Sequence, residues 1–269
     1  MLPRRAALVV LSLLSFASSA LATERVPRIV VDPGHGGEKP GAKSPSGVME
    51  KDVALQVAQR VRSKLETALS AQVHLTREKD GTLALGERVK FANGWKPDLF
   101  ISIHANSMPT RKMRQRASGI ETYFLAADAS GTSARAVADR ENADAPTVKA
   151  ARGDSTLAFI LDDLARMEAH SDSSRLAHAV HPKLVGATGA PDRGVHQAPF
   201  YVLNGVEAPA ILIEVGYISH PEEGAKLTRA EYQDQLADAI AEGVGAFLSE
   251  VGGKRDAASN LPSATNTVP

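Results

Sequence analysis

Between residues 28 and 250 the sequence alternates short, β-branched apolar runs with longer segments whose apolar residues recur at a helical period. This alternation is the feature that most constrains the fold, because it is typical of an α/β protein whose helices flank a central sheet. We expect that sheet to be mainly parallel, with mixed pairing left open. The runs predict strands at residues 28–32, 72–76, 98–104, 119–125, 200–203 and 210–215. The periodic segments predict helices at residues 51–69, 82–95 and 228–250.

Two segments do not follow the alternation. Residues 132–185 are helical in pattern, Ala-rich and charged, and we predict no strand between Leu125 and Phe200. They are interpreted as a helical insertion on one side of the sheet. Residues 252–269 have no apolar periodicity, so we expect a disordered tail after a single domain at 23–251.

The N-terminus has the features of a signal peptide. Arg4 and Arg5 precede an uncharged, largely apolar run to Ala22, which ends in a small-x-small cleavage pattern. The alternative is a retained membrane anchor, although the run is shorter than the roughly 20 residues that cross a bilayer. We expect cleavage after Ala22 and export to the periplasm, with no transmembrane segment left. The Arg pair leaves the twin-arginine route open.

Charge and cysteine content exclude several classes of function. The full chain has a formal net charge of zero, and removing residues 1–22 leaves −2, which argues against nucleic acid or an anionic membrane as the main partner. The chain has no cysteine, so disulfides, thiolate metal sites and a cysteine nucleophile are excluded. Any metal must therefore be held by histidines and carboxylates.

Three of the strand-like runs lead into a group that can carry chemistry. The first, third and last lead into His35, His104 and Glu214, and ligands bind outside the carboxyl ends of strands in open α/β sheets. Glu50 begins a helix after a Gly-rich loop that can bring it beside His35. Two imidazoles and one carboxylate are a ligand set of zinc hydrolases that leaves one position open. We therefore predict zinc on His35, Glu50 and His104, with Glu214 as general base.

Each of these residues also has a simpler interpretation. His35 suits a polar turn, Glu50 suits a first helical turn because of the helix dipole, and His104 suits a buried histidine with core partners. Glu214 gives the sharpest signal, since a carboxylate directly after an apolar strand is costly to bury without a partner or a task. Together the four favour a functional site.

Longer motifs make the chain resemble zinc-dependent N-acetylmuramoyl-L-alanine amidases, in order from about residue 27 to 250. The motifs are VVDPGHGG, the Glu50-Lys51 helix start, ERVKFANGWKPDLFISIHANS and FYVLNGVEAPAILIEVGYISHPEE. The resemblance implies that His35, Glu50 and His104 bind zinc and that Glu214 is the catalytic glutamate. It also implies a peptidoglycan substrate, cleaved between the muramic acid lactyl group and L-alanine.

The insertion is similar to the extra helical region of the Gram-negative cell-separation amidases. The similarity rests on ADRENADA and on LAFILDDLARMEAHSDSSRLAHAV. It implies a region that occludes the cleft, with Glu141 as an autoinhibitory zinc ligand until a periplasmic activator with a degenerate wall-peptidase domain displaces it. Without the resemblance, Glu141 is interpreted as an exposed helix charge.

We therefore expect a periplasmic zinc amidase that remodels the cell wall and separates daughter cells. Asn106 and His196 are candidates for contacting the substrate. The rival enzyme is a peptidoglycan endopeptidase with the same site but another scissile bond. The rival that is not an enzyme is a wall-binding or regulatory module that keeps the fold without turnover.

Overall fold

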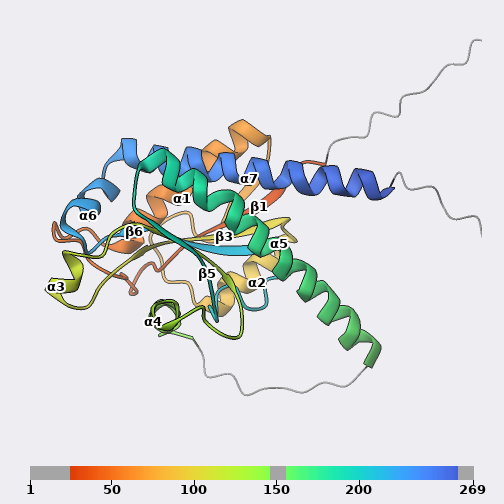
Figure 1. Cartoon of the computed structure of the whole chain (residues 1–269), viewed down its shortest axis with the longest axis horizontal. Helices are drawn as coiled ribbons and strands as arrows, with labels where there is room; N and C mark the ends of the chain where they lie inside the picture. Colours follow the sequence, from red (N-terminus) through yellow and green to blue (C-terminus); the bar gives the residue numbers. More distant parts are fainter. Residues whose placement is uncertain (1–24, 146–155, 260–269) are drawn as a thin grey trace, which may run out of the picture.

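Six strands form one central sheet in the computed structural model, which describes residues 25–145 and 156–259 (Figure 1). The strand order is β2-β1-β3-β6-β4-β5. The strands are β1 (Arg28–Pro33), β2 (Gln72–Leu75), β3 (Leu99–Asn106), β4 (Ile120–Leu125), β5 (Asp192–Ala198) and β6 (Ala210–Tyr217). Neighbouring strands are parallel except β4 and β6, which are antiparallel. The predicted α/β fold with a mainly parallel sheet is confirmed, with one mixed pair.

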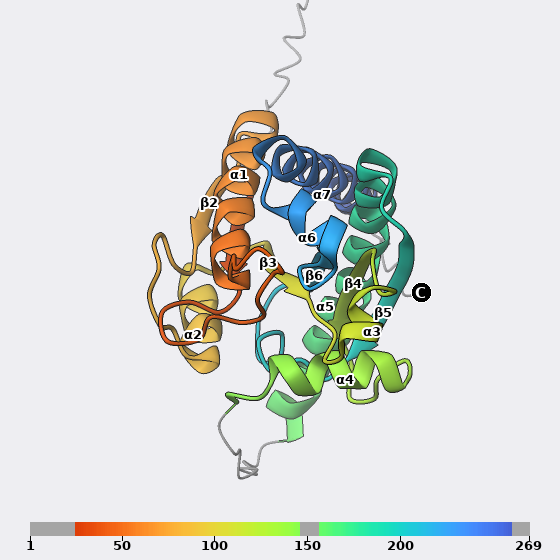
Figure 2. The same ribbon diagram turned by 90° about the vertical axis from the view of Figure 1, so that its left-hand side faces the viewer.

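Three long helices cover one face of the sheet (Figure 2). They are α1 (Glu50–Leu69), α5 (Thr156–Thr188) and α7 (Ala230–Ser259). The apolar stripe of α1, from Val53 to Leu65, is fully buried, as its i, i+4 spacing predicts. It joins the larger hydrophobic core with side chains from α5, α7 and the strands β1, β3 and β6.

Shorter elements cover the opposite face. Helices α2 (Leu85–Trp95) and α4 (Thr132–Glu141) pack there with the segment around Phe200 in a second, smaller core. Helix α4 contributes only small side chains, Ala134, Val137 and Ala138, so it lies close to the sheet face. The remaining helices, α3 (Arg111–Arg114) and α6 (Pro221–Leu227), are short and follow β3 and β6.

Two predicted strands differ from the structure. Residues 200–203 form turns rather than a strand; Phe200, Val202 and Leu203 are apolar because they are buried in the smaller core. Residues 119–125 do form a strand, but β4 is almost fully buried rather than half-exposed, because α5 covers one of its faces.

Strand β5 contradicts the expectation of no strand between Leu125 and Phe200. Its residues, DRGVHQA, are mostly polar and lack the β-branched pattern used to find the others. The strand lies at the edge of the sheet and pairs only with β4, so little of it is buried. An edge strand with polar residues has no periodic apolar signal to detect.

The described parts of the predicted insertion are helical, at Thr132–Glu141 and Thr156–Thr188, and the second of these helices belongs to the core of the domain. Leu176, Ala177, Val180 and Leu184 of α5 are fully buried in the larger core. At the other end, α7 continues to Ser259, past the boundary predicted at residue 251.

Other expectations lie outside the described residues. These are the signal peptide at residues 1–22 and the last part of the predicted tail, 260–269. Within the part of the chain that the structure describes, no helix is long and apolar enough to cross a membrane.

Candidate metal and catalytic site

The loop after β1 is held by two buried arginines. Arg88 donates to the carbonyls of Pro33 (2.7 Å) and His35 (2.6 Å), and Arg77 donates to those of Pro33 (3.0 Å) and Gly34 (2.7 Å). His35 has a left-handed backbone, with φ of 56°, which a residue other than glycine adopts only when its surroundings fix it. The arginine contacts provide that constraint and fix where the His35 ring lies.

Asp32 anchors Arg88 beneath this loop. Its Oδ1 accepts hydrogen bonds from Arg88 (2.7 Å) and Thr76, and its Oδ2 accepts one from Ser102 (2.9 Å). Burial alone raises the pKa of Asp32, but the positive charge of Arg88 and these hydrogen bonds outweigh it, so the pKa lies below its usual range. The buried carboxylate is therefore charged and paired, as burial requires.

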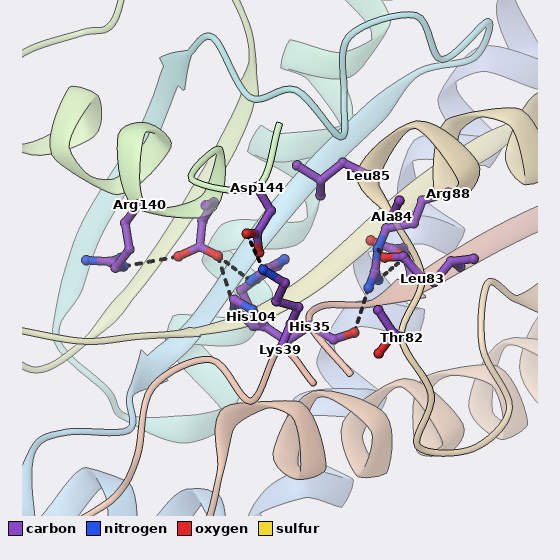
Figure 3. A pocket seen from close by; sticks show the side chains of 12 residues that line it. His35, Lys39, Thr82, Leu83, Ala84, Leu85, Arg88, His104, Arg140 and Asp144 are labelled. Atoms are coloured by element: carbon purple, nitrogen blue, oxygen red, sulfur yellow. Dashed lines mark hydrogen bonds and ion pairs between the residues drawn. The ribbon is translucent and has the colours of Figure 1, made fainter. Parts of the chain in front are cut away.

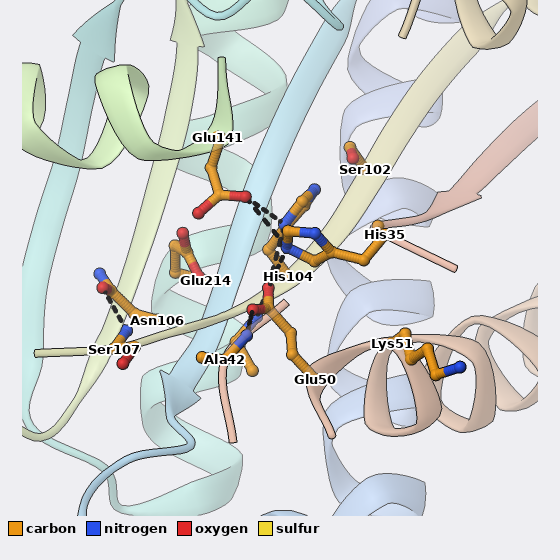
Figure 4. A network of polar contacts seen from close by, with 12 residues as sticks. His35, Ala42, Glu50, Lys51, Ser102, His104, Asn106, Ser107, Glu141 and Glu214 are labelled. Atoms are coloured by element: carbon orange, nitrogen blue, oxygen red, sulfur yellow. Dashed lines mark hydrogen bonds and ion pairs between the residues drawn. The ribbon is translucent and has the colours of Figure 1, made fainter. Parts of the chain in front are cut away.

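Four side chains converge above β1 and β3 (Figure 4). His35 Nε2 lies 3.0 Å from Glu50 Oε1 and 3.2 Å from Glu141 Oε2. His104 Nδ1 lies 3.1 Å and 3.0 Å from the same two oxygens. One ligand atom from each of the four residues lies within 4.8 Å of all the others. The residues predicted to hold the metal are thus together, and Glu141 of α4 joins them.

Backbone contacts orient Glu50 toward this cluster. Its Oε2 accepts a hydrogen bond from the amide of Ala42 (2.9 Å), and its Oε1 accepts one from the amide of Ala105 (3.1 Å). The chain passes so close that a Cβ on Gly41, whose φ is +66°, would lie 2.6 Å from Glu50 Oε2. The Gly-rich loop therefore packs directly against the carboxylate, which explains its composition.

Glu214 lies beside the cluster on β6, opposite His104 of β3 in the strand register. Its side chain is fully buried, and neither oxygen has a hydrogen-bond partner among the described residues. Arg140 Nη2 is 3.9 Å from Oε1. Burial, and next the charge of Glu141, raise the pKa of Glu214 well above its usual value. A buried carboxylate without a partner is costly and indicates a chemical task.

The charges in the cluster favour a bound cation. Glu50, Glu141 and Glu214 place three buried carboxylates around two imidazoles. Burial lowers the pKa of His35, but Glu50 and Glu141 outweigh it and raise the pKa to about 9. The carboxylates thus attract positive charge to this point. A divalent ion supplies that charge while leaving the imidazoles neutral, as metal ligands must be.

The remaining predicted residues lie outside the four-residue group. Asn106 Nδ2 donates to Glu121 Oε2 (2.7 Å), and its Oδ1 accepts from Arg140 (2.8 Å). The ring of His196 points back to its own strand, with Nε2 2.7 Å from the carbonyl of Arg193. Asn106 is therefore linked to α4, whereas His196 lies apart from the cluster.

Glu121 and Arg140 are site residues that the sequence analysis missed. The carboxylate of Glu121 is buried and accepts hydrogen bonds from four side chains. These are Asn106, Tyr123, Tyr217 and Arg193, at 2.6 to 3.1 Å. A signal was present, because Glu121 stands in an apolar strand just as Glu214 does. Arg140 gave no such signal, since it lies on a helix that is mostly polar.

A small pocket lies beside His35 and His104 (Figure 3). Its walls come from the β1 loop, the start of α2 and the end of α4. They include His35, Lys39, Thr82, Leu85, Arg88, His104, Glu141 and Asp144. Lys39 and Asp144 form an ion pair across it, joining the β1 loop to the segment after α4. The cluster is thus enclosed between α4 and the loop.

One family model and several known proteins match this chain. A family model described as N-acetylmuramoyl-L-alanine amidase matches residues 29–246. The N-acetylmuramoyl-L-alanine amidase AmiC of Escherichia coli O6:H1 is 35% identical over 224 residues, which cover 82% of this chain and 53% of that protein. AmiA of Escherichia coli K12 is 35% identical over 80% of this chain and 74% of its own length. The chain spans about half the length of the AmiC relatives.

A solved structure agrees with these sequence matches. The N-acetylmuramoyl-L-alanine amidase from Clostridium difficile 630 superimposes with a TM-score of 0.64 at 30% identity, covering 84% of this chain and 98% of that one. The matched residues include His35, Glu50, His104 and Glu214, which the sequence analysis selected from their positions after strands and from the amidase-like motifs. With the sheet, the clustered side chains and the sequence match in agreement, this chain belongs to the N-acetylmuramoyl-L-alanine amidase family.

Proposed function

We propose that this protein is a periplasmic, zinc-dependent N-acetylmuramoyl-L-alanine amidase. Its substrate is peptidoglycan, and its reaction hydrolyses the amide between the muramic acid lactyl group and L-alanine. The observation that carries the proposal is the pairing of a four-residue metal group with an unpartnered, buried Glu214 beside it. Residues 1–22 direct export, and the cell-wall cleavage serves the separation of daughter cells.

The donor set and its spacing support zinc. Four ligands at 2.0–2.1 Å around a tetrahedral zinc ion lie about 3.3 Å apart. The nitrogen–oxygen distances here are 3.0 to 3.2 Å. His35, Glu50 and His104 would hold the ion, since imidazole and carboxylate are its usual ligands in the absence of cysteine. When bound, zinc supplies Lewis-acid polarisation of the amide carbonyl and of the attacking water.

Glu214 then carries the proton transfers. Its carboxylate accepts a proton from the water that attacks the amide carbon, and its raised pKa suits it to hold that proton. Protonated Glu214 next passes the proton to the nitrogen of L-alanine, which leaves as an amine. Glu214 is fully buried within the apolar strand β6, which limits the access of bulk water to its carboxylate.

Two rivals are weaker on the same observations. An endopeptidase could use the same side chains, but AmiA of Escherichia coli K12 and the solved Clostridium difficile 630 protein, which match 80% and 84% of this chain, are both named as N-acetylmuramoyl-L-alanine amidases. A wall-binding module without turnover has no use for Glu214, whose burial without a partner costs stability.

Mass spectrometry of the fragments released from purified sacculi tests the proposal. We expect free stem peptides that begin with L-alanine, and glycan strands whose muramic acids carry an unsubstituted lactyl group. Cleavage between two amino acids of the stem would instead identify an endopeptidase. Intact sacculi after incubation with zinc-loaded parent protein and with the Glu141→Ala variant would favour the binding module.

We further propose that Glu141 holds the enzyme in a restrained state. Its Oε2 lies 3.2 Å from His35 Nε2 and 3.0 Å from His104 Nδ1, so it would take the fourth ligand position of an ion held by His35, Glu50 and His104 and keep the attacking water out. Arg140 holds the other oxygen of Glu141 at 3.1 Å and also donates to the carbonyl of Ser107 (3.0 Å).

Further contacts hold the end of α4 in place. The side chain of Asn142 donates to the carbonyl of Pro199 (2.7 Å) and accepts from the amide of Tyr201 (2.8 Å). A periplasmic activator with a degenerate wall-peptidase domain would release α4 by binding the open form more tightly than the closed one.

Glu141→Ala should raise the basal rate at which sacculi are digested without any partner. The variant frees the fourth position while the three other ligands still hold the ion, so a coupling of about 1–3 kcal/mol predicts a gain of about 5- to 150-fold. The rate is measured as dye release from labelled sacculi by zinc-loaded protein of verified folding. Asp139→Ala, an exposed carboxylate on the same helix, is the matched control and should leave the rate unchanged.

Removing the whole insertion is a poorer test of this restraint. Ser173 Oγ accepts a hydrogen bond from the amide of Ala210 at the start of β6, and Leu176 is in the core. A deletion that reaches these residues would damage the domain itself. If the insertion lies across the cleft, apolar residues such as Leu157, Phe159 and Ile160 should be buried against the domain, but these side chains lie outside the described ones. A Glu141→Ala variant no faster than the parent would show that this residue does not restrain the enzyme.

A further inference from the structure

An exposed basic patch follows β3 directly after the site. It consists of Arg111, Lys112, Arg114 and Arg116, all exposed, on and just after helix α3. No acidic residue lies between Asn106 and Gly119. The whole chain has no net charge, so this concentration of positive charge is a local feature. We call these four residues the α3 patch.

Most of the positive charge in the α3 patch is unpaired. Arg114 donates to the carbonyls of Met108 (2.6 Å) and Pro109 (3.2 Å) and so helps to shape the loop. The side chains of Arg111, Lys112 and Arg116 make no hydrogen bond or ion pair with any other described residue. The surface cations Lys64 and Lys183, in contrast, pair with Asp238 and Glu242. Unpaired cations are free to bind an anion from outside the chain.

The loop that carries the α3 patch is tied to the site. The amide of Met108 donates to Ser219 Oγ (3.0 Å), just after β6, and the carbonyl of Ser107 accepts from Arg140. Helix α3 lies with α6 at the end of the molecule where β6 ends (Figure 1). In Figure 4, Asn106 and Ser107 lie on the Glu214 side of the histidines. The patch therefore flanks the site on the side of the general base.

We propose that the α3 patch binds the free carboxylates of the peptidoglycan stem peptide, an inference that rests on the proposed function. Glu214 gives its proton to the leaving amine, so the stem peptide must extend from the scissile bond on the side of Glu214. That peptide carries free carboxylates, whereas the sugars of the glycan strand are uncharged. Arginine side chains suit such a ligand because their guanidinium forks match a carboxylate bidentately.

The patch also acts before the site opens. Its cations are exposed while Glu141 still fills the fourth ligand position, so they can hold the wall peptide on the closed enzyme. The closed enzyme can therefore bind the wall peptide without cleaving it. Attraction of this kind between exposed charges weakens as the salt concentration rises.

The test uses a variant that lacks three positive charges of the α3 patch but keeps the hydrogen bonds that shape its loop. The variant Arg111→Gln/Lys112→Gln/Arg116→Gln leaves Arg114, whose hydrogen bonds hold α3. The matched control, Lys64→Gln/Lys90→Gln/Lys183→Gln, makes the same change in net charge on other helices. Both are made in the full chain with Glu214→Gln, so that sacculi stay intact during binding. The probe is sacculi before and after their carboxylates are converted to amides with carbodiimide and ammonium.

Cosedimentation at low salt gives the first result. We expect the parent and the control to bind untreated sacculi roughly tenfold more tightly than amidated sacculi, the lower end of what a charged surface contributes. The α3 variant should bind both kinds equally, at the weaker level. Equal binding of the α3 variant and the parent to untreated sacculi, or no effect of amidation on the parent, would overturn the proposal. So would an equal loss in the control variant.

Two further arms separate the proposal from its rivals. In enzymes that keep Glu214, the α3 variant should have a kcat/KM about tenfold below that of the parent on soluble muropeptides, mainly because its KM is higher. On amidated muropeptides the α3 variant and the parent should have the same kcat/KM. If neither the parent nor its Glu141→Ala variant cleaves the muropeptides, the proposed function is wrong, while the sedimentation result still decides the role of the patch. Vesicles of phosphatidylglycerol test a membrane as ligand. Loss of vesicle binding in the α3 variant, with sacculus binding intact, would assign the patch to lipid.

Discussion

Glu214→Gln is expected to lose turnover by about 100- to 10,000-fold, the usual contribution of a general base. The amide is nearly the same size as the carboxylate but cannot accept a proton from water. The metal group should be unaffected, because none of its four residues forms a hydrogen bond with Glu214 among the described contacts. The measurements are the rate of dye release from labelled sacculi and the zinc content of the purified variant.

The same substitution should leave stability equal or higher. Glu214 is buried without a hydrogen-bond partner beside Glu141, and its raised pKa means that the folded apoprotein must either bury the charge or take up a proton, which lowers stability at neutral pH. Replacing a buried, unpartnered charge by a neutral amide removes that cost. Thermal unfolding of the apoproteins measures this effect. Glu214 therefore serves activity at a cost in stability: the substitution should lower the rate of digestion without lowering the melting temperature.

Glu207→Gln provides the control for this experiment. It removes the same charge from an exposed position and should change neither the rate nor the melting temperature. A Glu214→Gln enzyme that digests sacculi at close to the parent rate would remove Glu214 from the role of base. A variant that loses both zinc and stability would instead place Glu214 among the structural residues.

The sequence predicted the strands that carry the site because they are the most buried ones. Strands β1, β3 and β6 lie at the centre of the sheet, so both of their faces need apolar residues and the runs are nearly continuous. His104 and Glu214 then stand out as polar residues within such runs. The order of the strands was not predictable, and with it the pairing of His104 opposite Glu214.

Other parts of the site could not be found in this way. Strand β5 needs few apolar residues because it is an edge strand, and its polar sequence carries no period. The side chain of Glu141 is only 5% exposed, yet it lies at the end of a polar helix whose pattern predicts solvent. Its burial arises from packing between α4 and the β1 loop, which are far apart in sequence. Only the family resemblance pointed to Glu141.

Removal of the metal is expected to abolish digestion completely, and added zinc should restore it. The reason is that His35, Glu50 and His104 converge on one point, where a bound ion would polarise the amide and balance the charge of the buried carboxylates. His104→Ala should lose bound zinc as well as activity, because it removes one of only three ligands that remain when Glu141 leaves. Glu141→Ala should keep its zinc. Zinc content is measured by mass spectrometry after dialysis, beside the rate of sacculus digestion.

Metal loss should also be visible as a loss of stability. A ligand that binds only the folded state stabilises it by about 2.7 kcal/mol when its concentration is 100 times its Kd. The parent should therefore melt at a lower temperature after chelation, whereas His104→Ala should melt at the same temperature with and without chelator. His178→Ala, an exposed histidine of α5, is the matched control and should behave like the parent in each measurement. Full digestion by metal-free parent protein would refute the zinc mechanism, whatever the melting temperatures show.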